Sequence, residues 1–283
     1  MTHSPIELCA GDLRLSLAPE LGGSIAGLWH GELPILRSTP AAELGSSRLS
    51  GCYPLVPYSN RLGYRKFRWL GQDHSTQPNF DDNPHSLHGV GWQRAWEVLS
   101  QSGTEAELRY LHAADAHWPF SFEVRQRFIL ADDGLEVNLV FTNTAAHAQP
   151  VGLGWHPYFA KRSRSRLHIE LTDRWESDAS GLPTRKVPQP GIDGDVAHLS
   201  FDNCFEGWKG AARIRDEKLS MKLTSSMPYL VVYTPAQKDI FCVEPVSHVS
   251  NAIHMSDPLA HGLRSVAAGA TVDAWMRLDV ARV

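Results

Sequence analysis

The feature that most constrains the fold of this chain is an alternation of apolar and polar residues with a period of two. It is clearest in FEVRQRFIL (122–130) and LEVNLVFTN (135–143), and it recurs in DLRLSLAP (12–19), LHIEL (167–171) and MKLTS (221–225). Because successive side chains of a β-strand point to opposite faces, this pattern is typical of strands with one buried face. Clusters of Gly, Pro, Asn and Asp separate the segments and supply turns. With no long amphipathic helix between them, the sequence predicts an all-β protein, a large antiparallel β-sandwich.

Length and charge narrow the organisation and the class of ligand. A chain of 283 residues favours a single domain over residues 1–283, and we expect the Gly- and Pro-rich segment 178–200 to be a long surface loop. The chain has 27 Lys and Arg against 31 Asp and Glu, a net charge of −4. This balance argues against nucleic acid or an anionic membrane as a partner and favours a small neutral or weakly charged ligand. We expect a monomer or a weak homodimer.

The cysteines and the N-terminal sequence indicate the compartment. Cys9, Cys52, Cys204 and Cys242 are far apart, form no C-x-x-C pair and lie in apolar or aromatic neighbourhoods. Free thiols often pack in such places as small hydrophobic groups. The first residues, MTHSPIELCAGDLRL, have no basic region followed by a long apolar stretch, and no segment reaches about 18 uninterrupted apolar residues. We therefore expect a reduced, cytoplasmic protein that does not span a membrane.

Two apolar segments each contain one ionisable residue directly followed by proline. They are GLGWHPYFA (152–160), with His156, and IFCVEPVSH (240–248), with Glu244. A residue before proline is held extended and proline cannot donate to a sheet ladder, so both residues are expected at a strand end, an edge or a bulge. Side chains held there can enter a cleft as a general acid and a general base. A hydrogen-bonded core histidine is the simpler interpretation of His156 alone, whereas a glutamate in such a segment needs a cation or a ligand.

Two further segments place polar side chains among aromatic ones. GCYPLVPYSNR ends with Asn60 and Arg61, and HSLHGVGWQRAWEV contains His88 followed by Trp92 and Trp96. Aromatic rings near fixed polar groups suit a sugar, whose C–H faces pack on rings while its hydroxyls need hydrogen bonds. The alternative interpretation is core packing for most tryptophans and a surface ion pair for Arg61.

Together with FDNCFEGW and the closing HGLRSVAAGATVDAWMRLDV, these segments occur in the order and approximate spacing of the aldose 1-epimerase (mutarotase) family. The chain resembles that family over nearly its whole length. The resemblance implies a galactose mutarotase-like β-supersandwich without a cofactor, an isomerase that interconverts the α and β anomers of a free hexose. It also implies that Glu244 is the general base and His156 the general acid.

The same resemblance implies a set of substrate-binding residues. His88 in the HG motif matches a second active-site histidine, Arg61 in NR a substrate-binding arginine, and Asp202 in FDNCF a carboxylate that binds sugar hydroxyls. Asn60 is transferred less directly. No H-E-x-x-H motif or Cys/His ligand cluster is present, so we expect no metal.

One departure from the family pattern leaves the substrate open. After HPYF the chain reads AKRSRSRLHIEL, where better-known galactose mutarotases continue with Asn and Leu. We interpret the basic segment from Lys161 to Arg166 as a solvated loop. The sharper alternative is an anion site, because related proteins act on hexose 6-phosphates and others on a sulfonated hexose. The remaining alternatives are a glycoside hydrolase that uses Glu244 and Asp202, and a non-catalytic sugar-binding protein.

Overall fold

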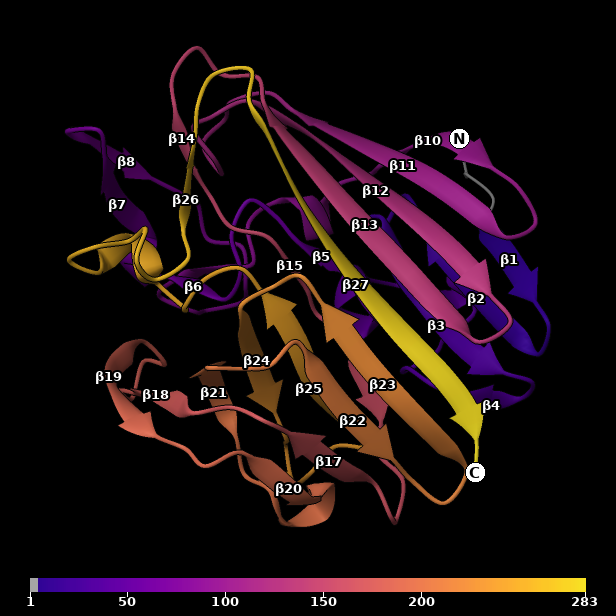
Figure 1. The fold of residues 1–283 in the computed structure, drawn as a ribbon. Helices are drawn as coiled ribbons and strands as arrows, with labels where there is room; N and C mark the ends of the chain where they lie inside the picture. Colours follow the sequence, from indigo (N-terminus) through magenta and orange to yellow (C-terminus); the bar gives the residue numbers. More distant parts are fainter. Residues whose placement is uncertain (1–4) are drawn as a thin grey trace.

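The computed structural model describes residues 5–283, and β-strands make up almost all of its regular structure. Its largest part is a nine-stranded antiparallel sheet that runs diagonally across Figure 1. In their order across the sheet, the strands are β10 (Glu97–Gln101), β11 (Glu105–His112), β12 (Phe122–Ala131), β13 (Gly134–Asn143), β27 (Thr271–Arg282), β23 (Leu219–Ser225), β22 (Ala211–Arg215), β17 (Arg166–Ile169) and β20 (Ile192–Asp195).

A second large antiparallel sheet has eight strands. In order they are β19 (Pro183–Pro188), β18 (Asp173–Ser177), β21 (Asp202–Glu206), β24 (Tyr229–Tyr233), β25 (Ile240–Val246), β15 (Gly154–Trp155) and β5 (Pro54–Leu55), with β16 (Tyr158–Ala160) also on β25. Two short strands, β15 and β16, therefore share one edge of β25.

The rest of the regular structure consists of small sheets and single turns of 3-10 helix. A four-stranded sheet holds β1 (Ile6–Ala10), β2 (Leu13–Ala18), β3 (Ser24–His30) and β4 (Leu33–Pro34). The strand pairs are β14 (Gln149–Val151) with β26 (Arg264–Val266), β6 (Arg61–Leu62) with β9 (Ser86–Leu87), and β7 (Lys66–Trp69) with β8 (Gln72–Ser75). The 3-10 turns are η1 (Ala41–Glu43), η2 (Ser47–Leu49), η3 (Gly63–Arg65), η4 (Gly91–Gln93), η5 (Val196–His198) and η6 (Ala252–His254).

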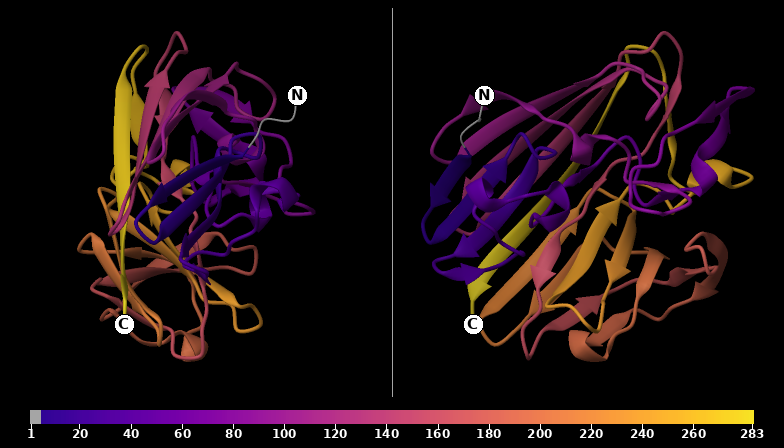
Figure 2. Two further views of the ribbon diagram at one scale, coloured as in Figure 1. Left: turned by 90° about the vertical axis from the view of Figure 1, so that its right-hand side faces the viewer. Right: turned by 180° about the vertical axis from the view of Figure 1, so that it is seen from behind.

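The sheets form two packed layers. The left view in Figure 2 shows the nine-stranded sheet nearly edge-on, with β27 at the left and the indigo strands of the four-stranded sheet beside it. One hydrophobic cluster joins them: Val124 and Val137 from the first layer pack in the same core as Leu15 and Phe241 from the second. Burial alternates along β12, as the period of two predicts, because only one face of this sheet meets the core. The prediction of an all-β sandwich is confirmed.

The prediction of a loop over 178–200 is wrong. The segment contains β19 on the edge of the eight-stranded sheet, β20 on the edge of the nine-stranded sheet, and the turn η5. Edge strands are short and polar in many proteins because they have only one neighbour and little buried surface. The composition of this segment is therefore that of edge strands as much as of a loop.

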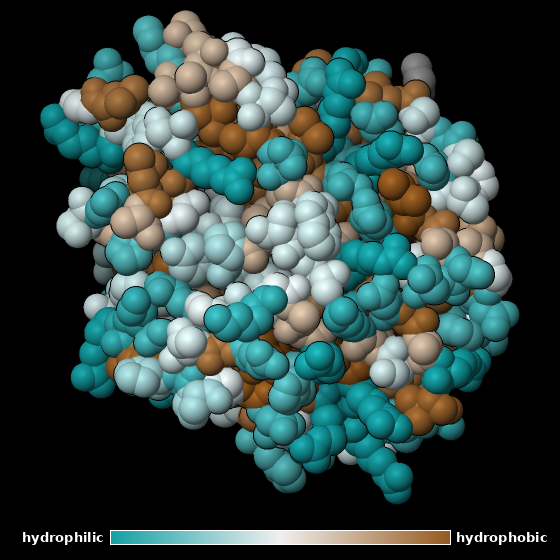
Figure 3. All heavy atoms as spheres, in the orientation of Figure 1, coloured by the Kyte–Doolittle hydropathy of each residue, from teal (hydrophilic) through white to brown (hydrophobic). Residues whose placement is uncertain are grey.

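The outer face of the nine-stranded sheet is solvated. In Figure 3, which has the orientation of Figure 1, hydrophilic side chains are spread widely over this face. Among the described residues, no helix has the length and apolar character needed to cross a membrane.

Candidate active site

All six side chains predicted for the site line one pocket of about 600 Å³. Three of them come from the eight-stranded sheet: Asp202 begins β21, Glu244 lies in β25, and His156 directly follows β15. The other three come from segments that cover this sheet, and they are Asn60, Arg61 and His88.

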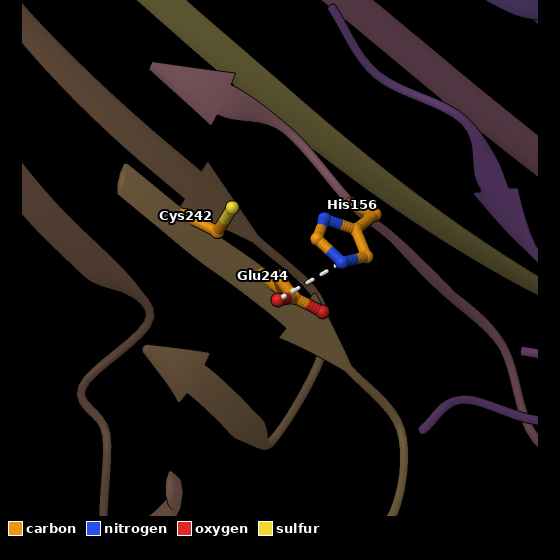
Figure 4. Close-up of side chains that lie close together, drawn as sticks. All are labelled: His156, Cys242 and Glu244. Atoms are coloured by element: carbon orange, nitrogen blue, oxygen red, sulfur yellow. Dashed lines mark ion pairs between the residues drawn. The ribbon is translucent and has the colours of Figure 1, made fainter. Parts of the chain in front are cut away.

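Strand register sets His156 opposite Glu244. β15 pairs Gly154 with Val246, and β16 pairs Tyr158 with Cys242, so the same antiparallel register places His156 across from Glu244. Figure 4 shows the two side chains facing each other, with His156 Nε2 at 3.5 Å from Glu244 Oε1. The acid and base candidates, distant in sequence, are therefore a cross-strand pair.

Two prolines remove backbone hydrogen bonds between these strands on either side of the His156–Glu244 pair. Ser247 N donates to Leu153 O, and antiparallel ladders alternate, so the amides at positions 157 and 245 face the partner strand. Both positions are prolines and lack the N–H. The alternation also makes His156 and Glu244 a non-hydrogen-bonded pair, in which side chains lie closest.

One expectation about the prolines is wrong. Glu244 and Pro245 were expected at a strand end, an edge or a bulge, but β25 continues through both to Val246 and has neighbours on each side. Pro245 is tolerated inside the strand because it lies opposite Trp155, the last residue of β15, where the pairing with β25 stops until it resumes at Tyr158 in β16. The expectation holds for His156, which follows the end of β15.

Burial disfavours charge on both members of the pair. The pKa of Glu244 lies well above its usual range because the carboxyl is buried and close to the charge of Asp202, an effect that Arg61 partly opposes. The pKa of His156 lies well below its usual range because of burial and the nearby His88 and Arg37. Both shifts favour a neutral pair with its proton on the carboxyl.

Tyrosines hold the imidazole of His156 in place. Its ring stacks on Tyr158, with ring centroids 4.4 Å apart and an interplanar angle of 12°, and Tyr53 packs against it at 4.9 Å. The two tyrosine hydroxyls are 3.1 Å apart, and that of Tyr158 lies 3.4 Å from His156 Nε2. On the other face of Tyr158 the guanidinium of Arg37 lies 3.9 Å from the ring centroid.

His88 is fixed as a neutral hydrogen-bond donor. The backbone N–H of Asn60 donates to His88 Nδ1 at 3.1 Å, so the neutral ring carries its proton on Nε2. Burial and the charge of Arg61 lower the pKa of His88 to about 3. Both Asn60 (φ 54°) and His88 (φ 64°) have left-handed backbones, and such strained conformations gather at functional sites.

Asn60 positions Arg61. Its side-chain oxygen accepts hydrogen bonds from Arg61 Nη1 at 3.0 Å and from the Ser250 hydroxyl at 3.0 Å. Arg61 Nε is buried and has no hydrogen-bond partner among the described residues. A Cβ at Gly181, where φ is +84°, would lie 2.5 Å from this nitrogen. The turn before β19 therefore packs directly against the guanidinium of Arg61.

The basic segment from Lys161 to Arg166 does not line this pocket. Lys161 Nζ donates to the carbonyl of Pro235 at 2.9 Å, and Arg162 forms a buried ion pair of 2.6 Å with Asp216. The interpretation as a solvated loop is therefore wrong for Arg162, whose side chain is only 14% exposed.

Sequence reasoning missed other residues that line the pocket. Tyr158 is two positions after His156, so it shares the same face of the extended segment, and that spacing was an available signal. Three cationic residues also line the pocket, and no sequence pattern identifies them because they come from separate segments. They are Arg37, Arg48 and Lys238.

The aromatic rings at the pocket are not the tryptophans that the sequence suggested. Trp92 and Trp96 are each 2% exposed and belong to the core. The rings that line the pocket are those of Tyr53, Phe80, Tyr158 and Tyr233.

The catalytic candidates also form a set of possible metal ligands with one cysteine. Ligand atoms of His156, Cys242 and Glu244 all lie within 4.8 Å of one another. The sequence has no metal motif because these ligands come from β25 and from the distant segment that follows β15.

Comparisons with known proteins give the family. The family model described as aldose 1-epimerase matches residues 5–278. The uncharacterized protein YphB of Escherichia coli K12 is 33% identical, over 96% of this chain and 97% of that protein. A crystal structure from Escherichia coli K12 superposes with a TM-score of 0.90 at 30% identity over 99% of each chain. A galactose mutarotase-like protein from Clostridium acetobutylicum gives a TM-score of 0.86 at 18% identity, over 99% of this chain and 96% of that one. The chain belongs to the aldose 1-epimerase family.

Proposed function

We propose that this protein is an aldose 1-epimerase that interconverts the α and β anomers of a free hexose. The observation that carries the proposal is the His156–Glu244 pair, 3.5 Å apart in a pocket of about 600 Å³. Opening and closing a sugar ring needs one group that donates a proton and one that accepts it, within reach of the same carbon. The pair supplies both.

In the proposed reaction Glu244 takes the proton from the C1 hydroxyl while protonated His156 donates to the ring oxygen. The C1–O5 bond breaks and leaves the open-chain aldehyde. Rotation about C1–C2 turns the other face of the carbonyl toward the C5 hydroxyl. The same two groups, working in reverse, then close the ring to the opposite anomer.

The electrostatics of the site act in opposite directions on the two proton arrangements of this reaction. The reactive form has a Glu244 carboxylate and a His156 imidazolium, and ring opening converts them to a carboxylic acid and a neutral imidazole. Burial raises the pKa of Glu244 and lowers that of His156, so it favours the second form. The buried pocket therefore stabilises the proton arrangement that accompanies the open-chain sugar.

The surrounding residues would orient the sugar. His88 Nε2–H suits the ring oxygen or a neighbouring hydroxyl as a neutral donor, while Arg61 and Asp202 suit hydroxyls as donor and acceptor. Tyr53 and Tyr158 would fix the ring of His156 through the contacts described above.

A second candidate function is anomerisation of a hexose that carries a phosphate or a sulfonate. It is favoured by the cations of the pocket rather than by the segment from Lys161 to Arg166. Arg48 already holds Asp81 at 2.9 Å, and Arg37 donates to the Ser50 carbonyl at 2.9 Å. Lys238 has no ion pair in the described part of the chain, and its ammonium lies 5.8 Å from the Tyr233 ring centroid. Lys238 is thus the cation most available to an anionic substituent.

NMR exchange rates for glucose, galactose, glucose 6-phosphate and sulfoquinovose test these candidates. Catalysed exchange of any of them supports the epimerase, and a preference for the anionic sugars that Lys238→Met removes supports the second candidate. Equal rates on neutral and anionic sugars contradict the second candidate. Cleavage of an aryl glycoside would instead indicate a glycoside hydrolase, and sugar binding without faster exchange would indicate a non-catalytic sugar-binding protein.

A further inference from the structure

We propose that His156, Cys242 and Glu244 form an inhibitory site for a borderline-soft divalent metal such as Zn²⁺. Figure 4 shows the three side chains converging from β25 and from the segment after β15. Metal binding at this site does not depend on the proposed function, whereas inhibition of anomerisation by the metal rests on it.

One ligand separation already fits a tetrahedral site, and the other two are no longer than 4.8 Å. Cys242 and Glu244 are two residues apart on β25 and so point to the same face. Their ligand atoms and that of His156 lie within 4.8 Å of one another. Bonds of about 2.3 Å to sulfur and about 2.0–2.2 Å to nitrogen and oxygen require ligand separations of roughly 3.3–3.8 Å. The pair of His156 Nε2 and Glu244 Oε1, at 3.5 Å, already meets this requirement.

The ligands are also short of other partners. His156 is only 8% exposed, and the polar partners of its Nε2 among the described residues are the Tyr158 hydroxyl, at a long 3.4 Å, and Glu244. Glu244 is 3% exposed, and its only close polar partner in the described part of the chain is His156. Buried polar groups without such partners are costly, and a metal ion would satisfy them.

Charge balance and donor type select the class of metal. Binding turns the Cys242 thiol into a thiolate and the Glu244 carboxyl into a carboxylate, and it releases both protons to solvent. One thiolate and the Glu244 carboxylate then neutralise a divalent ion, which suits a site with little solvent. A sulfur–nitrogen–oxygen set favours Zn²⁺ or Co²⁺ over Mg²⁺ or Ca²⁺, which prefer oxygen ligands alone. Because His156 and Glu244 line the pocket, a fourth position faces it and can take water.

The functional consequence is competition with the sugar. A metal held by His156 and Glu244 occupies the atoms that would donate and accept the proton. The metal should therefore inhibit anomerisation, and a chelator should restore it.

Cobalt binding tests the site without relying on activity. In a Cys9→Ser background, which removes the one exposed thiol, we expect one equivalent of Co²⁺ to give a thiolate–cobalt charge-transfer band in the near ultraviolet. Adding Cys242→Ser or Cys242→Ala should abolish the band. Adding Cys52→Ser, which alters another buried thiol outside the ligand set, should leave it. A band that survives both Cys242 variants, or no stoichiometric binding by the background protein, overturns the proposal.

Inhibition is measured separately. The Zn²⁺ concentration that halves each protein's own metal-free rate should rise about tenfold or more in Cys242→Ser, because one of three ligands is lost. EDTA should restore the rate of the Cys9→Ser protein. Cobalt binding without Zn²⁺ inhibition would contradict the inhibitory role, and absence of anomerisation with an intact cobalt band would contradict only the proposed function.

Discussion

At the scale of single residues, the site places two buried ionisable groups so that neither is easily charged. Asp202 and Arg61 act on Glu244 in opposite directions, since the charge of Asp202 raises its pKa and that of Arg61 lowers it. A pair that works with one proton loses activity at low pH, when His156 takes a second proton, and at high pH, when Glu244 loses the last one. In a plot of kcat/KM against pH, the lowered pKa of His156 places the fall on the acid side below pH 6.5. The raised pKa of Glu244 places the fall on the alkaline side above pH 4.5.

The two neighbours of Glu244 should therefore move the alkaline limb of kcat/KM in opposite directions. Asp202→Asn removes a like charge, so we expect the limb to shift by roughly half to one pH unit toward acid. Arg61→Met removes an opposite charge and should shift it toward alkali. Asp193→Asn, on the exposed edge strand β20, is the control and should leave it in place. Shifts of the same sign in both variants would contradict this account of Glu244.

At the scale of elements, the sequence predicts strands well and their partners poorly. The alternation in 122–130 and 135–143 identifies β12 and β13, because a half-buried strand has a local pattern. The pairing of His156 with Glu244 has no such local signal. It depends on two short strands sharing one edge of β25, a register set by distant segments. Edge strand β19 was missed because three of its six residues are polar or charged and two are proline, so it has no alternating apolar pattern.

The turn before β19 packs against Arg61, which we propose binds the sugar. Gly181→Ala introduces a methyl group 2.5 Å from Arg61 Cζ and adds backbone strain of about 1 kcal/mol at φ +84°. The guanidinium must move, so we expect KM for the sugar to rise several-fold with a smaller change in kcat. Gly71→Ala, at a φ of +81° with open space around its Cβ, matches the strain without the contact. Equal effects of both variants on KM would show that Arg61 is not involved.

At the scale of the whole molecule, one core connects the layers that carry the site. The eight-stranded sheet supplies Glu244 and Asp202, and its inner face packs on the nine-stranded sheet in a single hydrophobic cluster. We propose that residues 1–283 form one domain on this basis. The alternation of apolar and polar residues predicts a sandwich of two sheets. The order of strands across each sheet depends on contacts between distant segments, so the sequence does not show it.

A single domain should unfold in a single step. We expect differential scanning calorimetry to give one transition whose calorimetric enthalpy equals its van't Hoff enthalpy, because neither large sheet can bury its inner face alone. Two resolved transitions would mean that the layers unfold as separate units.

The central claim, that Glu244 and His156 catalyse anomerisation, is tested most directly by replacing the base with its uncharged isostere. NMR exchange would be measured on the hexose that the wild type converts fastest, with Glu206→Gln as control. Glu206 is a half-buried glutamate on β21 that holds Trp175 and Lys186 and does not line the pocket. We predict that Glu244→Gln lowers kcat by about 10²–10⁴-fold while Glu206→Gln stays near the wild type. A wild-type rate in Glu244→Gln would contradict the account.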